Sequence, residues 1–252
     1  MTHDFTGRTV VITGAAGVYG REFASRFAAA GANLFLTDKT VDSLEGTHAG
    51  NPSVRIHAAD LTRDADLETL CGAVLEEFGP PDVVVNNAGV YPFGGLFDTS
   101  LETFDQVFSI NVRANFEITR RLSRAMIDAA RPGVFVFIGS AAAHVLRTNG
   151  LAYCASKRAL EWMMKGIALE LGQHGIRVNM LEPGLAQGSL GADFPDGYVE
   201  AITGQIPLRR LIEPGEAADA LLFLASENAR YVNGATLAVD GGGSIPHRQR
   251  IS

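Results

Sequence analysis

Short apolar runs alternate with longer helical patterns along almost the whole chain of 252 residues. Most of the runs stop at glycine, aspartate or asparagine. Near-continuous apolar strands separated by helices are typical of a parallel sheet that is buried on both faces. The sequence therefore predicts strands at Thr9–Thr13, Asn33–Thr37, Val54–Ala58, Asp82–Val85, Val134–Ile138, Ile176–Leu181 and Thr236–Val239.

A parallel sheet needs a crossover between successive strands, and such crossovers are right-handed. The expected fold is therefore α/β, a Rossmann-like doubly wound parallel sheet of about seven strands with helices on both faces. No linker, repeat or low-complexity stretch divides the chain, so we predict a single domain over residues 1–252. A glycine-rich substrate loop around 184–207 follows a strand's carboxyl end, and we expect a lid there, with a variable surface loop as the alternative.

Composition restricts the partners and the compartment. The chain carries 21 basic and 28 acidic residues, a net charge of −7, which argues against nucleic acid or an anionic membrane as a partner. The two cysteines are far apart and show no metal-ligand spacing, as expected of reduced thiols and of a protein without a metal site. There is no apolar signal segment and no apolar run of roughly 20 residues, so we expect a soluble, cytoplasmic protein.

A glycine-rich turn follows the first strand. The segment Thr13–Gly20 (TGAAGVYG) leads into a helical pattern at Arg21–Ala30. Glycines at such a turn let the backbone approach a pyrophosphate at the positive end of the helix. Asp38 ends the second strand, where a carboxylate accepts hydrogen bonds from ribose hydroxyls and repels a 2′-phosphate. These residues indicate an NAD site, although Asp38 also suits a plain turn.

Four polar residues suit proton transfer to or from an alcohol. Tyr153 and Lys157 stand four residues apart in a helical pattern and therefore share one face. A neighbouring ammonium lowers the pKa of a phenol, which makes Tyr153 a better acid/base at neutral pH. Ser140 ends the fifth strand, and Asn111 lies in a helical segment, Ser109–Arg124. Each residue alone has an ordinary structural explanation, and only the set points to catalysis.

The sequence resembles the short-chain dehydrogenase/reductase family over nearly its whole length. Thr13, Gly14 and Gly20 match the family's T-G-x-x-x-G-x-G motif, whereas Val18 replaces the middle glycine. Asn86–Gly89 (NNAG), Asp60-Leu61 and Pro183-Gly184 match further family positions. The resemblance implies an NAD site formed by Gly14, Gly17, Val18, Tyr19, Asp38, Asp60, Leu61, Asn87, Ala88, Gly89, Tyr153, Lys157, Pro183 and Gly184.

The resemblance also implies roles for the four polar residues and an assembly. Ser140 would orient the substrate and Tyr153 would be the acid/base. Lys157 would also hold the nicotinamide ribose, and Asn111 would support a water relay. A threonine often follows four residues after Gly184 in the family, and Gly188 stands there, so its contacts would come from Gln187 or Ser189. A homotetramer is expected, since two helical segments carry apolar residues on more than one face.

Three functions fit these residues. The first is an NAD-dependent dehydrogenase that moves hydride between the cofactor and a small secondary alcohol or ketone. The second is an NADPH-dependent 3-oxoacyl-carrier-protein reductase, which Asp38 argues against, although Lys39 could attract a phosphate. The third, of another class, is a catalytically silent binding or regulatory protein on the same fold.

Two polar residues stand where the substrate pocket is expected. His144 is four residues after Ser140, and Glu182 directly precedes Pro183. A carboxylate there costs free energy to desolvate unless a cation pairs with it, and Arg147 or His144 could do so. Alternatively, Glu182 accepts hydrogen bonds from substrate hydroxyls. That alternative predicts a polyol or another polar substrate.

Overall fold

The computed structural model describes residues 3–188 and 197–245, with the side chain of Tyr198 left out. Its centre is a seven-stranded sheet in the order β3-β2-β1-β4-β5-β6-β7, and each neighbouring pair is parallel. The predicted fold class is confirmed. The strands are β1 (Thr9–Thr13), β2 (Asn33–Asp38), β3 (Val54–Ala58), β4 (Val83–Asn86), β5 (Gly133–Ile138), β6 (Ile176–Pro183) and β7 (Thr236–Val239).

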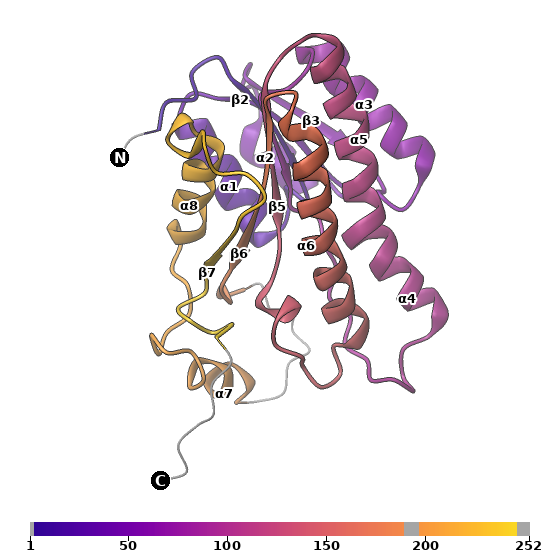
Figure 1. The fold of residues 1–252 in the computed structure, drawn as a ribbon, viewed down its shortest axis with the longest axis vertical. Helices are drawn as coiled ribbons and strands as arrows, with labels where there is room; N and C mark the ends of the chain where they lie inside the picture. Colours follow the sequence, from indigo (N-terminus) through magenta and orange to yellow (C-terminus); the bar gives the residue numbers. More distant parts are fainter. Residues whose placement is uncertain (1–2, 189–196, 246–252) are drawn as a thin grey trace.

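Helices cover both faces of the sheet. Figure 1 shows α1 and α8 on one side and α3, α5 and α6 on the other. The helices are α1 (Val18–Ala29), α2 (Asp42–His48), α3 (Asp64–Phe78), α4 (Leu101–Phe108), α5 (Asn115–Asp128), α6 (Leu151–Gly172), α7 (Tyr198–Thr203) and α8 (Glu216–Ala225). No helix within the described ranges has the length and apolar character needed to cross a bilayer.

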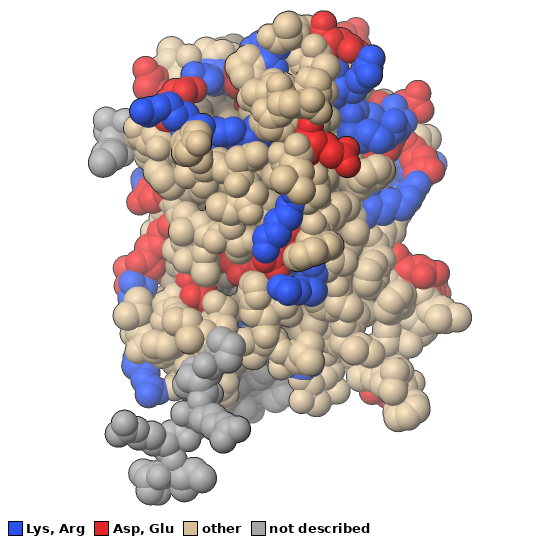
Figure 2. Space-filling view, viewed as in Figure 1, with Lys and Arg blue, Asp and Glu red and all other residues tan. Residues whose placement is uncertain are grey.

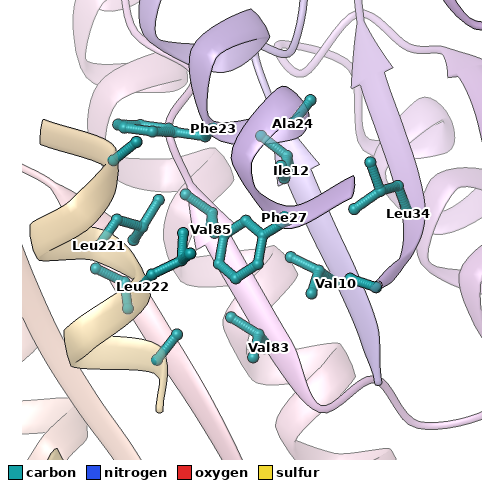
Figure 3. Close-up of a cluster of buried hydrophobic side chains, with 14 of the residues drawn as sticks. Val10, Ile12, Phe23, Ala24, Phe27, Leu34, Val83, Val85, Leu221 and Leu222 are labelled. Carbon is teal, nitrogen blue, oxygen red and sulfur yellow. The ribbon is translucent and has the colours of Figure 1, made fainter. Parts of the chain in front are cut away.

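The central strands β1, β2, β4, β5 and β6 are apolar because each of them supplies two cores. Val10 and Ile12 of β1 pack with Phe27 of α1 and Leu221 of α8 (Figure 3). Val11, between them, points to the other face, toward α3, α5 and α6. This alternation follows from the pleat of a strand. Full burial of each such side chain stabilises the fold by roughly 1.5–3 kcal/mol.

Two boundaries of the predicted strands and first helix shift by more than one residue in the structure. The first helix begins at Val18, three residues before the expected Arg21, so the glycine turn is tighter than expected. The strand β6 runs on to Pro183 because Glu182 and Pro183 pair with Ala238 and Val239 of β7. As a result, Glu182 belongs to the sheet and not to a loop.

The predicted helical segment Ser109–Arg124 is helical but not uniform. Residues Ser109–Ala114 form a π-helical turn between α4 and α5. Such wide turns often occur at functional sites. The predicted substrate loop 184–207 is not all loop, because it contains α7. Residues 189–196 of that loop, including Ser189, lie outside the described residues, so the lid stays a prediction.

Candidate active site

A cleft of about 1400 Å³ opens at the edge of the sheet where the strands end. It extends from the turn after β1 to the end of β6 and reaches α7, at the bottom of Figure 1. Such an edge is the expected ligand site in doubly wound folds. The cleft is lined by every residue predicted to hold the cofactor: Gly14, Gly17, Val18, Tyr19, Asp38, Asp60, Leu61, Asn87, Ala88, Gly89, Tyr153, Lys157, Pro183 and Gly184.

The turn after β1 requires glycine at two places. Gly14 has a φ of +62°, and a Cβ there would lie 2.7 Å from the Cα of Ala88. A Cβ on Gly20 would lie 2.2 Å from the carbonyl oxygen of Gly14. Gly17 caps α1, and Val18 is its first residue, so the helix begins at the cleft. The first backbone N–H groups of a helix have no partner within it and attract an anion.

Thr13 and Asn87 join the ends of β1 and β4. The backbone N–H groups of Asn87 and Ala88 donate to Thr13 Oγ1, each over 3.0 Å. Asn87 Nδ2 donates to the carbonyl oxygens of Thr13 and Gly14, each over 2.9 Å. These four hydrogen bonds fix the floor of the cleft beside the glycine turn.

Asp38 and Asp60 lie at the adenosine end expected for a dinucleotide. The carboxylate of Asp38 accepts hydrogen bonds from the backbone N–H of Ala16 (2.9 Å) and of Lys39 (2.7 Å). Lys39 Nζ lies 2.8 Å from Asp60 Oδ2. The hydrogen bond from Lys39, with further ones from Thr62, lowers the pKa of Asp60 to about 2. The Asp60 carboxylate is therefore ionised at neutral pH, and Lys39 has a protein partner.

Ser140 and Tyr153 meet in the cleft. Both residues line the cleft, and the Ser140 hydroxyl acts on Tyr153 to lower the pKa of its phenol. The ring of Tyr91 packs against that of Tyr153, with 4.4 Å between the ring centroids. Ser140 Oγ also accepts a hydrogen bond from the backbone N–H of Ala142 over 3.2 Å. Two hydroxyl groups are thus fixed side by side next to the glycine turn.

Lys157 is almost fully buried, at 4% exposure. Its Nζ donates a hydrogen bond of 2.9 Å to the carbonyl oxygen of Ile138 and lies 5.7 Å from the centroid of the Tyr153 ring. Burial lowers the pKa of Lys157 to about 8, against the opposing charge of Glu182.

The pKa of Tyr153 differs from the expectation. A lowered value was expected from Lys157, but burial raises the pKa of Tyr153 above its usual value. The reason is that desolvation of the phenolate exceeds the opposing effects. The groups that oppose it are Ser140, through its hydrogen bond, and Arg147, through its charge. The phenol therefore keeps its proton at neutral pH in this structure.

Asn111 lies behind the cleft and not on its wall. It is fully buried in the π-helical turn, at 0% exposure. Its Oδ1 accepts from the backbone N–H of Val90 (2.9 Å), and its Nδ2 donates to the carbonyl oxygen of Val90 (3.1 Å) and to Ser156 Oγ (3.0 Å). Asn111 thus ties the segment after β4 to α6.

His144 and Glu182 pair with each other. Nε2 of His144 lies 3.1 Å from both carboxylate oxygens of Glu182, which is 1% exposed. A Cβ on Gly139 would lie 2.8 Å from Cγ of Glu182, so Glu182 packs against Gly139, the residue before Ser140. Neither residue lines the cleft. The structure therefore places the predicted substrate contacts behind the wall, in the ion-paired alternative.

Sequence reasoning missed three groups at the site. Tyr91, Ser156 and the carbonyl oxygen of Ile138 contact Tyr153, Asn111 and Lys157 respectively. A backbone carbonyl leaves no sequence signal. Tyr91 follows the predicted N-N-A-G segment by two residues, and Ser156 adjoins Lys157, so their proximity to the motifs was the only available signal.

Comparisons with known proteins agree with this geometry. A family model described as enoyl-(acyl carrier protein) reductase matches residues 14–244. The chain is 35% identical to L-xylulose reductase of Mesocricetus auratus over 94% of this chain and 96% of that protein. A crystal structure of a short-chain type dehydrogenase/reductase from Mycobacterium marinum has a TM-score of 0.90 and 29% identity, covering 96% and 98% of the two chains. The chain belongs to the short-chain dehydrogenase/reductase family.

A second relative is 2,3-dihydro-2,3-dihydroxybenzoate dehydrogenase of Bacillus subtilis. It is 35% identical over 95% of this chain and 97% of its own length. The chain therefore covers nearly the whole length of both relatives, and it is an oxidoreductase of this family acting on alcohols.

Short-chain dehydrogenase/reductases use a nicotinamide dinucleotide, NAD or NADP. The residues of this chain fit such a group. A Cβ at Gly14 or Gly20 would collide with neighbouring backbone. Because glycine has no Cβ, the turn at the start of α1 can be compact. A Cβ on Gly89 would lie 3.3 Å from Asn111 Oδ1 and 3.4 Å from Lys157 Nζ. Glycine at this position therefore leaves space beside the Lys157 ammonium group.

We predict that His144→Ala destabilises this short-chain dehydrogenase/reductase, and more so at pH 8 than at pH 5. Burial raises the pKa of Glu182, and His144 is the main opposing group. Without His144, the ionised carboxylate is buried unpaired, which costs about 1–3 kcal/mol. A raised pKa means that the folded state binds the proton more tightly, so stability falls as the pH rises. The negative charges of Glu161 and Asp240 act in the same direction.

Urea unfolding at the two pH values measures this effect. His174→Ala, at an exposed histidine, is the matched control and should leave stability nearly unchanged. Adding Glu182→Gln to His144→Ala should remove most of the pH dependence. Equal destabilisation by His144→Ala at both pH values would contradict the ion-pair interpretation.

Proposed function

We propose that this chain is an NAD-dependent dehydrogenase/reductase that interconverts a small polar secondary alcohol and its ketone. The observation that carries the proposal is that Ser140 and Tyr153 line the same cleft as the glycine turn, with Lys157 between the cleft and the end of β5. Two hydroxyls at one point can hold and protonate a single oxygen atom. A binding protein would have no need of that arrangement, which argues against the silent alternative.

The names of the two relatives support a polar substrate. One relative is a reductase of L-xylulose, and the other is a dehydrogenase of a dihydroxylated benzoate. Both names describe small hydroxylated molecules. We carry this class, and not either molecule, over to the present chain.

The chain's own residues would move the proton of the reaction. Bound NAD supplies or accepts the hydride at the substrate carbon. In oxidation, the Tyr153 phenolate would take the proton of the alcohol; in reduction, the Tyr153 phenol would give a proton to the oxygen of the ketone. Ser140 donates a hydrogen bond to the substrate oxygen, and Lys157 favours the phenolate through its positive charge. Proton transfer by a positioned group contributes about 10²–10⁴-fold to the rate.

Asn111 would act indirectly. It holds the segment after β4 against α6 through Val90 and Ser156, beside the buried Lys157. Its family role in a water relay is part of the proposal. The raised pKa of Tyr153 suits proton donation to a ketone at neutral pH, whereas alcohol oxidation needs the phenolate and should increase as the pH rises.

We predict a clear preference for NAD(H) over NADP(H). Asp38 supplies a negative charge beside the glycine turn, and Lys39, the cation that could attract a 2′-phosphate, is paired with Asp60. Asp38→Ser should narrow the preference. The ratio of kcat/KM values for NADH and NADPH measures it; a ratio of one or less in the unmodified chain would favour the 3-oxoacyl-carrier-protein reductase alternative.

We predict that Tyr153→Phe removes nearly all turnover while NADH still binds. The substitution deletes the hydroxyl that carries the proton and keeps the ring that packs on Tyr91. Single-turnover NADH formation and NADH titration by fluorescence measure the two effects. Tyr231→Phe, at a fully exposed tyrosine, is the control and should leave both unchanged. More than about a tenth of the activity in Tyr153→Phe would contradict the proposed proton transfer.

We also propose a homotetramer in the cytoplasm. Exposed apolar side chains support the assembly: Phe116 of α5 and Trp162 and Leu169 of α6, the last two at 72% and 84% exposure. Helices with surplus apolar surface commonly bury it through isologous contacts. Light scattering at micromolar concentration should give four chain masses, about 107 kDa from 26.8 kDa each. Trp162→Glu should shift the mass downward, and a monomer mass in the unmodified chain would exclude the assembly.

A further inference from the structure

Three basic side chains line the cleft within the described residues: Lys39, Arg147 and Lys157. Lys39 pairs with Asp60, and Lys157 is buried against the carbonyl oxygen of Ile138. The guanidinium of Arg147 makes no hydrogen bond or ion pair with any residue that the structure describes. Arg147 is thus a half-buried charge that lines the cleft without a hydrogen-bond or ion-pair partner among the described residues.

The carboxylate that could have neutralised Arg147 is already engaged. Glu182 is held by His144, with 3.1 Å to each oxygen, and lies behind the wall. Asp240 accepts hydrogen bonds from the backbone N–H groups of Gly242 and Ser244. The other carboxylates lining the cleft, Asp38, Asp60, Glu102 and Asp105, have no oxygen within 4.0 Å of a nitrogen of Arg147. No described carboxylate therefore neutralises Arg147 by contact.

Arg147 is also close to the reacting group. Its charge is one of the two effects that lower the pKa of Tyr153 against burial. The neighbouring Thr148 lines the cleft as well and adds a hydroxyl donor. Because Arg147 and Tyr153 line the same cleft, the guanidinium can contact another part of a small substrate that is held at Tyr153.

The loop that carries Arg147 is held in place. The backbone N–H of Gly94 donates to the carbonyl oxygen of Asn149 over 2.9 Å, and Gly94 and Gly150 form a parallel bridge. Asn149 has a φ of +61°, a conformation that costs free energy for a residue with a side chain. Gly150 accepts a hydrogen bond from Cys154 of α6 over 2.8 Å. A fixed loop lowers the entropic cost of binding through Arg147.

We propose that Arg147 binds a carboxylate of the substrate, so that the molecule oxidised is a hydroxy acid and its product a keto acid. This inference rests on the proposed function and narrows its substrate from polar alcohols to anionic ones. A guanidinium presents a planar pair of donors that matches a carboxylate. One unpaired cation balances one negative charge, which favours a carboxylate over a phosphate dianion.

Matched pairs of substrates test the proposal. Xylonate and xylitol share carbon skeleton and hydroxyl groups and differ in a carboxylate against a CH₂OH group; threonate with threitol and gluconate with glucitol are equivalent pairs. Initial rates of NADH formation give kcat/KM for each. The acid of a productive pair should be favoured at least 10-fold, since a hydrogen bond to a charged group is worth roughly 10- to 100-fold. Glucitol 6-phosphate, as a phosphate source, should show no such advantage.

Arg147→Gln should remove the preference. It should lower kcat/KM for the acid about 10- to 100-fold more than for the alditol, which is affected only through the action of Arg147 on Tyr153. Arg147→Lys should restore part of the loss. Arg124→Gln is the matched control, because Arg124 lies on α5, pairs with Asp128 and is remote from the lining of the cleft. An equal loss for acid and alditol in Arg147→Gln would mean that Arg147 acts on Tyr153 alone, and it would overturn the proposal.

A binding measurement separates this proposal from the proposed function. In the NADH-loaded protein no oxidation can occur, so calorimetry with xylonate, threonate and gluconate reports binding alone. At least one acid should bind more tightly than its alditol, and Arg147→Gln should abolish the difference. Turnover of alditols without any preference for acids would overturn the carboxylate site and leave the proposed function standing. Failure to bind NADH or to oxidise any alcohol would instead overturn the proposed function.

Discussion

The contact between the ends of β1 and β4 determines where every other part of the site can lie. Thr13 and Asn87 connect the two strand ends by four hydrogen bonds, and Gly14 lies so close to Ala88 that a Cβ would not fit. Because β5 and β6 continue the sheet from β4, Ser140 and Pro183 emerge at fixed distances from the glycine turn. The parallel sheet, buried on both faces, supplies the rigidity that a loop could not.

Buried charges next to this framework come in opposing sets. Lys157, Glu182 and Glu161 are all at or below 4% exposure, and each would be costly alone. Glu161 is flanked by Arg158 and Lys165, each at 2.6 Å, while Glu182 is held by His144. Glu182 in turn supports the charge of Lys157 against burial. A cationic Lys157 beside the phenol thus depends on a carboxylate that the substrate never contacts.

The sequence predicted the fold well for a physical reason. Central strands buried on both faces must be nearly continuous in apolar residues, so β1 was placed to the residue and β2, β4, β5 and β6 within two. The edge strands β3 and β7, which are only partly buried, were also placed to the residue. The cofactor residues were predictable because glycine at a tight turn is a steric requirement. The π-helical turn around Asn111 was not, since a hydrogen bond to the fifth residue leaves no periodic pattern in the side chains.

Direction and burial of the charged side chains were the remaining unknowns. Spacing alone correctly placed Tyr153 and Lys157 on one helix, but it could not show that Lys157 Nζ donates to Ile138 or that desolvation raises the pKa of Tyr153. Both depend on how deeply the helix α6 packs against β5 and β6. Likewise, the sequence offered His144 and Arg147 equally as partners of Glu182. Only the extension of β6 to Pro183, which buries Glu182 in the sheet, decides for His144.

The pairing of Glu182 with His144 affects the electrostatic potential in the cleft, because no described carboxylate then neutralises the charge of Arg147. The surroundings of Arg147 strengthen the effect. Figure 2 shows charged side chains gathered mainly in the upper part of the face drawn, while the lower part, toward the strand ends, is largely uncharged. Leu96, Phe97 and Leu146 are exposed on the segments beside the loop of Arg147, at 69%, 97% and 84%. Arg147 itself is only partly exposed, and a cation partly withdrawn from water is less screened and acts more strongly on an anion that enters the cleft.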